Sequence, residues 1–502
     1  MKPSLTRLER LFPGWGLKRA MARARLGAVK GLYKAARPDR THPRRGDNLS
    51  ANAVMSRTDG RLRSIARYAD ENHDLAISVF DDLENWVIGT GLSIEPMART
   101  GPDTLAEDFN RDARELWDEW WQRPETTGEL SGPDVERLIA RSTYRDGECL
   151  VHHVNAARYP YRTPIPYVLE CLEADYLDFD MNSGAQDGRG KIIQGVEVDT
   201  WGRPVAYHLW REHPGEEGWV FNLGRQRTGI KRLLARDLSH VKFVRRLRQL
   251  RGVPIVHGVL RRMDDIRELE DSELTAARYD ADLTAVIRNI PQFGQEVEGD
   301  KGDPEQQFSM QSGMMVHTFD AEEVDVHTPS RPNPQLESFR MGQIQMVAAG
   351  TGTRKSSISK NYDGTYSAQR QELVEGQMSY AKLRMTLIGS FYKPVWRRFI
   401  DSAILAGQLS ARGVDRRTLY RADYRGPATP WIDPEKEISA QIQRVEGKLG
   451  SRHQAIRDLG NDPVTTFEQI ENDPYGQDSG SPDEPPDDEE QQREAPLREV
   501  SR

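Results

Sequence analysis

The feature that most restricts the fold is a helical pattern that begins near Pro254 and continues for about thirty residues or more. Charged residues of both signs surround one narrow apolar face. The apolar positions are Val256, Val259, Leu260, Met263, Ile266, Leu269, Leu274, Ala277, Ala281 and Val286. At 1.5 Å per residue, such a helix would span roughly 45 Å. A helix with this pattern usually packs against parallel copies or bridges modules.

We therefore predict that the apolar seam of this helix is satisfied only by sister copies of the chain arranged in a circle. The residues expected to pack between copies are Val256, Leu260, Met263, Ile266 and Leu269.

Helices are also expected before this rod. The spacing predicts one over 58–87, ended by Gly89-Thr90-Gly91, a second over 105–121 with Trp117, Trp120 and Trp121 on one side, and a third opening at Gly132. Between 148 and 250 the pattern changes to short strands separated by Pro and Gly. The expected strands are 150–154, 167–172, 192–198, 205–210 and 219–221, with a hairpin tip at 199–204.

Residues 291–332 are loop-rich, and helical patterns return after them. We expect helices over 335–349, over 367–409 with a kink at Pro394, and over 434–448 and 453–459. The fold class that follows is α+β and predominantly helical. A length of 502 residues suggests two to four folding units.

Charge is distributed unevenly along the chain, whose net charge is -8. The first 45 residues are strongly basic, and the last 25 are acidic and rich in proline. Such a basic arm is typical of a segment that binds DNA phosphates or an acidic partner. It is equally typical of a solvated tail. The acidic end is typical of a disordered tail.

The two cysteines and the hydropathy pattern indicate a cytoplasmic place of synthesis. Cys149 and Cys171 lie in apolar stretches without metal-ligand spacing, so we expect two reduced, buried thiols. No apolar run approaches the roughly 20 residues that cross a bilayer, and the first residues lack the apolar core of a secretory signal.

A glycine-rich stretch over 350–357 superficially resembles a phosphate-binding loop. Arg354 stands where such a loop needs glycine before Lys355, and the stretch follows a helix instead of a buried strand. We therefore expect no nucleotide site.

Histidines and carboxylates give no coherent catalytic or metal-binding pattern. His152 and His153 alternate along a strand and point to opposite faces. His208 and His213 are separated by Trp210 and Glu212, and His240 has no acidic or Cys companion at ligand spacing. Asp175, Asp178 and Asp180 are interpreted as a surface turn. We predict no catalytic residue, no metal and no cofactor.

Several segments, in shared order over roughly 50–470, resemble the lambda-type family of tailed-bacteriophage portal proteins, the head–tail connectors. They are Arg145-Asp146-Gly147-Glu148 before a strand, Leu169 to Leu177 at a strand exit, Gly195 to Asp199 with Gly202 to Tyr207 as a hairpin, Asn361 to Arg370, and Trp431 to Glu437 with Gly460 to Pro463. In the fourth, Ala368-Gln369 replaces the family's usual small residues.

The resemblance implies an elongated subunit with wing, stem, clip and crown regions, assembling as a homo-oligomer, a dodecamer in this family, around a central channel. The expected regions are a basic arm (1–50), a helical wing (51–147), a β-rich clip-like module (148–250), a stem helix (251–290), a wing and channel-loop region (291–410), a helical crown-like region (411–470) and an acidic tail (471–502).

The resemblance implies that the protein lies in the virion, at the portal vertex of the capsid, and that it functions in viral genome packaging and ejection. Implied partners are double-stranded DNA read without sequence specificity, the terminase large subunit, a head-completion or adaptor protein, and the major capsid and scaffold proteins, with no membrane. A loop containing Ser330, Arg331 and Asn333 is the expected channel loop. Alternatives left open are another phage head or connector structural protein, or a DNA-processing enzyme.

Overall fold

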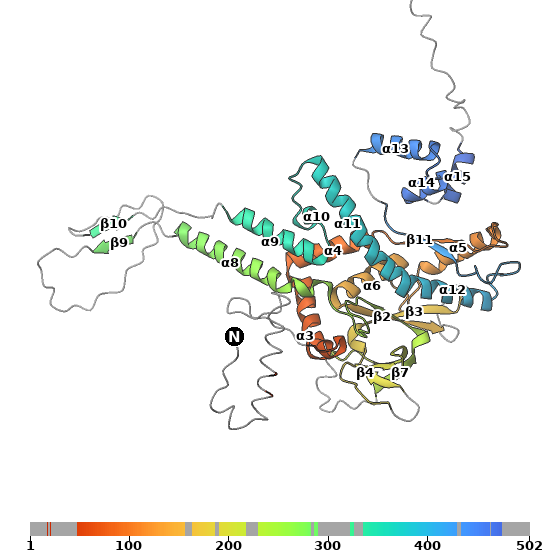
Figure 1. Ribbon diagram of the computed structural model, residues 1–502, viewed down its shortest axis with the longest axis horizontal. Coiled ribbons are helices and arrows are strands. Elements are labelled where there is room, and N and C mark those ends of the chain that lie inside the picture. Colours follow the sequence, from red (N-terminus) through yellow and green to blue (C-terminus); the bar gives the residue numbers. More distant parts are fainter. Residues whose placement is uncertain are drawn as a thin grey trace, which may run out of the picture. The chain divides into compact units, whose positions relative to one another are not determined.

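Helices and small antiparallel sheets alternate along the chain, as its computed structural model shows (Figure 1). The structure describes Lys18, Met21 and residues 48–155, 163–185, 190–216, 229–282, 286–289, 322–325, 335–428, 433–461 and 463–473. The predominantly helical α+β class is confirmed. Four regions lie outside the described residues: the strongly basic first 45 residues apart from Lys18 and Met21, the expected strand 219–221, the candidate channel loop and most of the acidic tail.

The N-terminal helices lie close to their predicted positions, except that one predicted helix is divided into two. The expected helix over 58–87 is two helices, because the backbone of His73 is extended at φ -120° and ψ 111°. Gly89 and Gly91, both with positive φ, follow the second helix as predicted. The bounds are α3 Ala51–Asn72, α4 Asp74–Val87, α5 Glu107–Trp121 and α6 Gly132–Asp146.

The central core is aromatic. Near the end of α5, Trp117 packs against Trp396 and Phe399 of α12 (Lys393–Leu405), and Trp120 packs against Phe399. Trp121 stacks on Trp117. Trp120 is 1% exposed, and its Nε1 donates a 2.7 Å hydrogen bond to the carbonyl oxygen of Tyr167. This bond satisfies the one polar atom of a large buried ring and ties α5 to a neighbouring strand.

Residues 148–242 are rich in strands, as expected, and form two sheets. The first has the antiparallel order β3-β2-β8, and the second the order β4-β5-β6-β7. The expected strand 192–198 is two strands joined by Gln194 and Gly195, and the predicted hairpin tip at 199–204 joins β5 to β6. The bounds are β2 Glu148–Asn155, β3 Tyr167–Glu173, β4 Lys191–Ile193, β5 Val196–Val198, β6 Pro204–Trp210, β7 Ile230–Leu234 and β8 Leu238–Lys242.

Two further strand pairs join segments that are distant in sequence. β1 (Ser93–Pro96) pairs with β11 (Ala422–Arg425), and β9 (Val286–Asn289) pairs with β10 (Glu322–Asp325). Both pairs are antiparallel, and neither was predicted.

The long helix from Pro254 is shorter than predicted. A 3₁₀ turn at Ile255–Gly258 precedes α8 (Leu260–Asp282), and Val286, expected on the same helix, lies in β9. The prediction for its seam is wrong over the first half: the chain's own core buries Val256, Leu260, Met263 and Ile266, and Leu269 is half-buried. Leu274, further along, is 52% exposed.

The C-terminal half is helical, as predicted, with a break near Pro394. Proline has no N–H to donate to the carbonyl of Ser390, and the backbone forms a π turn at Ile388–Tyr392 just before it. The helices are α9 Leu336–Thr351, α10 Lys355–Ser359, α11 Tyr366–Leu387, α12, α13 Pro434–Glu446, α14 Arg452–Asp458 and α15 Pro463–Glu471. No helix among the described residues is long and apolar enough to cross a membrane.

Candidate functional site

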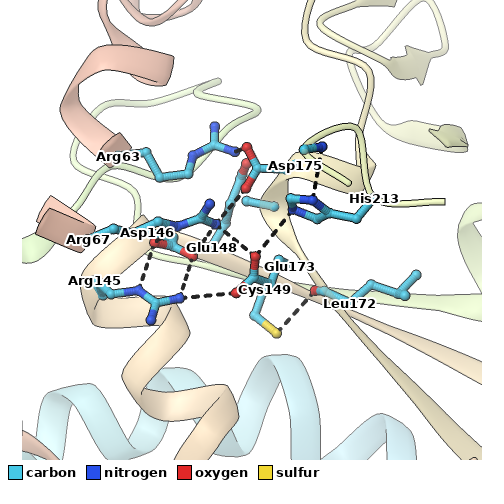
Figure 2. A network of polar contacts seen from close by, with 12 residues as sticks. Arg63, Arg67, Arg145, Asp146, Glu148, Cys149, Leu172, Glu173, Asp175 and His213 are labelled. Atoms are coloured by element: carbon cyan, nitrogen blue, oxygen red, sulfur yellow. Dashed lines mark hydrogen bonds and ion pairs between the residues drawn. The ribbon is translucent and has the colours of Figure 1, made fainter. Parts of the chain in front are cut away.

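The two most polar of the sequence motifs converge on one cluster of charged side chains (Figure 2). The first, 145–148, joins the end of α6 to the start of β2, and the second, 173–175, follows the end of β3. Two arginines of α3 complete the cluster. We call it the arginine–carboxylate junction, formed by Arg63, Arg67, Arg145, Asp146, Glu173 and Asp175.

Asp146 is the buried centre of the junction, with a side chain that is 0% exposed. Arg67 donates to its two carboxylate oxygens at 2.9 and 2.8 Å, and Arg145 donates to the same two oxygens at 3.0 Å each. Paired, planar contacts of this kind are the strongest that arginine makes with a carboxylate. They connect α3 to the end of α6.

Asp175 lies on the other side of Arg67. Its oxygens accept hydrogen bonds from Arg67 at 2.5 Å and from Arg63 at 3.3 Å. Burial by itself would raise the pKa of Asp175, but the charges of Arg63 and Arg67 outweigh burial and lower that pKa below its ordinary value. Asp175 is therefore an internal ion-pair partner. The interpretation of these carboxylates as a surface turn is wrong for Asp178, which is buried, and for Asp175, which is half-buried in ion pairs. It is confirmed for Asp180, which is exposed.

Glu173, Asp175 and His213 raise the question of a metal site, because one potential ligand atom from each lies within 4.8 Å of the others. Arg67 lies 3.2 Å from Glu173 and 2.5 Å from Asp175, and Arg145 lies 3.3 Å from Glu173. A cation placed there would meet guanidinium groups that already neutralise both carboxylates. The geometry therefore suits an ion-pair network and does not suit a metal.

A second buried ion pair adjoins the junction. Glu148 accepts from Arg251 Nε at 2.6 Å and from the Gly252 N–H at 2.7 Å. Arg251 is 0% exposed, and it also donates to the carbonyls of Ala174 and Gln194 at 3.2 Å each. Burial acts to raise the pKa of Glu148, yet Arg251 and His240 together lower it well below its usual range.

Glycine is required where these chain segments cross. Gly147 has a φ of 88°, and a Cβ atom on it would lie 2.5 Å from the backbone of Val253. A side chain is therefore excluded both by conformation and by space. This explains the glycine of the motif at 145–148: it lets the segment that follows β8 pass directly over the start of β2.

Each histidine of the strands has a structural partner. His152 pairs with Glu170 at 2.7 Å, while His153 on the opposite face is bonded to the Tyr167 hydroxyl at 2.7 Å and to Ser239 at 2.9 Å. The predicted opposite orientation is confirmed. Burial lowers the pKa of His153 to about 3, so this histidine is neutral at physiological pH.

His240 has no acidic companion at ligand spacing along the sequence, but the folded sheet supplies one. Its Nε2 lies 2.9 Å from Glu148 Oε2, a residue 92 positions earlier in the chain. Burial, before any other cause, lowers the pKa of His240 to about 4. A search for ligand spacing along the sequence does not find such a pair, because β2 and β8 become neighbours only in the folded sheet.

The glycine-rich stretch at 350–357 does not form a phosphate cradle. Gly350 and Thr351 belong to α9, and Gly352 ends that helix in the left-handed conformation. Arg354 turns inward, 3.6 Å from the buried Asp82 and 3.9 Å from the centre of the Trp86 ring. The arginine whose position argued against nucleotide binding is thus an interior structural residue.

The cysteines differ in their surroundings. Both are free; Cys149 is buried as predicted, and Cys171 is exposed, contrary to prediction. Burial raises the pKa of the Cys149 thiol well above its ordinary value. Neither lies in a metal cluster within the part of the chain that the structure describes.

The charged residues of the motifs at 145–148 and 173–175 are therefore paired with partners of the same chain. These contacts give the motifs a structural role, because they hold separate segments of the described chain together. Comparison with known proteins agrees: residues 37–384 match the family described as phage portal protein, lambda family. The chain belongs to that family.

The chain is also similar to individual relatives and solved structures. A probable portal protein of Halomonas phage phiHAP-1 is 24% identical over 438 residues, which cover 84% of this chain and 82% of the relative. Among solved structures, the neck of a native GTA particle with C12 symmetry is 12% identical with a TM-score of 0.48, covering 82% of this chain and 99% of that one. A native gene transfer agent virion is 14% identical with a TM-score of 0.40, covering 82% and 99%.

Proposed function

We propose that this portal protein assembles into a homo-oligomeric ring, a dodecamer, at one capsid vertex of the virion. Double-stranded DNA passes through its central channel during packaging and ejection. The ring binds the terminase large subunit first and a head-completion or adaptor protein later, and it contacts the major capsid and scaffold proteins during assembly in the host cytoplasm. The observation that carries the proposal is the family match over 37–384, which contains the junction and the helices around it.

The chemistry of the described residues supports a structural role over an enzymatic one. Asp146, Glu148 and Asp175 are held by arginines of the same chain, and the glycine-rich stretch ends a helix instead of binding phosphate. We propose that energy for DNA movement comes from the terminase and that the isolated chain hydrolyses no nucleotide.

The assignment of stem and clip needs revision in this proposal. In the first sheet of the 148–250 region, β2 is flanked on both sides, and the outer edge of β3 is occupied where the Leu169 N–H donates to the Pro124 carbonyl. The strand pair β9–β10, which lies in sequence between α8 and α9, is better suited to contact neighbouring subunits. The helices α8 and α9 are in contact, for example where Arg262 donates a hydrogen bond to Gln343, and we propose these two helices as the stem.

The expected channel loop stays a proposal as well. Alanine at Ser330, Arg331 and Asn333 together should reduce retention of packaged DNA while leaving the assembly of rings unchanged. Retention equal to that of the unaltered protein would remove this loop from the channel.

The proposed function is tested by purifying the full chain and determining its mass and symmetry. We expect a hollow particle of roughly half a megadalton or more with rotational symmetry in negative-stain micrographs. A monomer at high concentration would overturn the ring. Nucleotide hydrolysis by the purified chain would favour a DNA-processing enzyme.

A further inference from the structure

A groove lies between strand β2 and the segment that follows α12. Its volume is about 990 Å³, at the upper end of the roughly 300–1,000 Å³ of ligand-binding clefts. Every residue that lines it belongs to the described part of the chain. Its apolar lining includes Val154, Ile404, Val414 and Leu419.

Arginine is abundant on the side of the groove formed by residues 397–421. This segment, here called the basic segment, carries six arginines against two aspartates. Arg416 lines the groove, and the guanidinium of Arg397 lies 4.8 Å from the ring centre of Tyr420, another lining residue. Both arginines are exposed. The other exposed arginines of the basic segment are Arg412, Arg417 and Arg421.

The carboxylates that line the groove do not compensate this charge. Asp237 accepts from Arg398 at 2.9 Å, and Asp401 accepts from the Tyr420 hydroxyl at 2.6 Å. Within the described part of the chain, no carboxylate forms an ion pair with any of the four arginines at 412–421. A concave surface with excess positive charge attracts an acidic partner. The apolar lining favours a protein segment over the phosphates of a nucleic acid.

One segment of this chain has the complementary composition. Residues 482–490, here called the acidic segment, contain six carboxylates and three prolines in nine positions. Their Pro-x-x-Pro spacing at 482–485 is typical of extended segments that bind in grooves with aromatic lining, and Tyr420 supplies such a ring here. Carboxylates among the prolines can pair with the arginines beside that ring.

The described contacts hold the C-terminal helices, which carry the acidic segment, next to the strand that follows the basic segment. β11 comes directly after residue 421 and pairs with β1. Arg457 of α14 forms a 2.9 Å ion pair with Glu95 of β1. From Asp473, the nine residues to Pro482 can extend about 30 Å. This tether favours binding within one chain, because it gives the acidic segment a high effective concentration.

We propose that the acidic segment binds in the groove of its own chain, with its carboxylates paired to the arginines of the basic segment. The bound segment keeps these arginines from binding the phosphates of nucleic acid without specificity. This inference does not depend on the proposed ring.

Binding of an added peptide tests the contact in the full chain. A neutralised chain keeps its length but carries amides in place of the six carboxylates of the acidic segment. A fluorescent peptide of the sequence 480–492 is titrated into it, and anisotropy gives the Kd. The replacements are Asp483→Asn, Glu484→Gln, Asp487→Asn, Asp488→Asn, Glu489→Gln and Glu490→Gln.

Arg397→Gln with Arg416→Gln in the neutralised chain should raise this Kd at least about tenfold, because charge-assisted hydrogen bonds to the peptide are lost. The matched control is Arg57→Gln with Arg61→Gln, which removes two exposed arginines of α3 and should leave the Kd unchanged. Circular dichroism should be the same for both variants, since all four positions are exposed.

The unaltered chain supplies a second comparison. It should bind the added peptide at least about tenfold more weakly than the neutralised chain, because its own acidic segment occupies the groove. Equal affinity of these two chains would overturn binding of the chain's own segment. Equal effects of the two arginine pairs would overturn the groove as the site. A short DNA duplex that binds the neutralised chain more tightly than the peptide does, with the same dependence on Arg416, would assign the groove to nucleic acid instead.

Discussion

The aromatic core and the arginine–carboxylate junction stabilise neighbouring parts of the chain by opposite means. In the core, rings of α5 and α12 pack with centroids about 5 Å apart, such as 5.0 Å between Trp117 and Phe399. In the junction and the adjoining Glu148–Arg251 pair, charges are removed from water and compensated by one another. Apolar packing tolerates small changes in shape, whereas a buried charge tolerates no loss of its partner. The difference predicts that single substitutions will affect the two regions unequally.

The largest effect is expected from Arg251→Met. The substitution leaves the Glu148 carboxylate, 1% exposed, without its guanidinium, and a broken buried pair typically costs about 3–5 kcal/mol. Urea unfolding of the purified variant measures this loss. A cost below about 1 kcal/mol would mean that His240 and the Gly252 N–H suffice to hold the charge.

A pH-dependent effect is expected at Glu136, a buried carboxyl of α6 beside Trp121 and Tyr392. Burial raises its pKa from 4.5 to about 8, with the Leu92 N–H as one hydrogen-bond donor at 2.8 Å. The folded state therefore holds the proton more tightly than the unfolded chain does. Stability should be fully present below pH 4.5 and fall as the pH rises toward 8, by at most about 1.4 kcal/mol per pH unit.

Glu136→Gln should remove this contribution, because glutamine does not titrate. Comparing the unfolding free energies of the two proteins across the same pH range isolates the effect from other titrating groups. Parallel curves for the two proteins would show that the carboxyl is ionised in the folded chain.

A smaller loss is expected in the aromatic core. Phe399→Leu keeps an apolar side chain between Trp117 and Trp120 and should cost about 1–2 kcal/mol, through lost ring contacts and a small cavity. Urea unfolding checks it under the conditions used for Arg251→Met. A loss equal to that of Arg251→Met would erase the contrast between the two regions.

The smallest effect is expected where an ion pair is exposed. Lys436 lies 2.7 Å from Asp433, but its side chain is 80% exposed, and Lys436→Met should leave the urea midpoint of unfolding essentially unchanged. The same unfolding measurement applies. A change comparable to that of Arg251→Met would show that burial is not what separates the two pairs.

The sequence by itself determined most of the helices, the change to strands after Gly147 and the family. Local spacing is sufficient for these, because a helix or hairpin is specified by neighbours within a few positions, as in α5, α6 and the turn between β5 and β6. It also identified the motif at 145–148, although not what the motif does.

Only the tertiary structure decided which charges meet and which apolar faces are covered. Arg251 pairs with Glu148 across 103 positions, and Arg67 with Asp146 across 79, separations at which periodicity carries no information. The same holds for apolar faces: α8 and α9 both carry apolar residues at helical spacing, yet the core covers Met263 and leaves Met346 exposed. A helical period shows that a face is apolar, and what that face contacts depends on the packing of the whole chain.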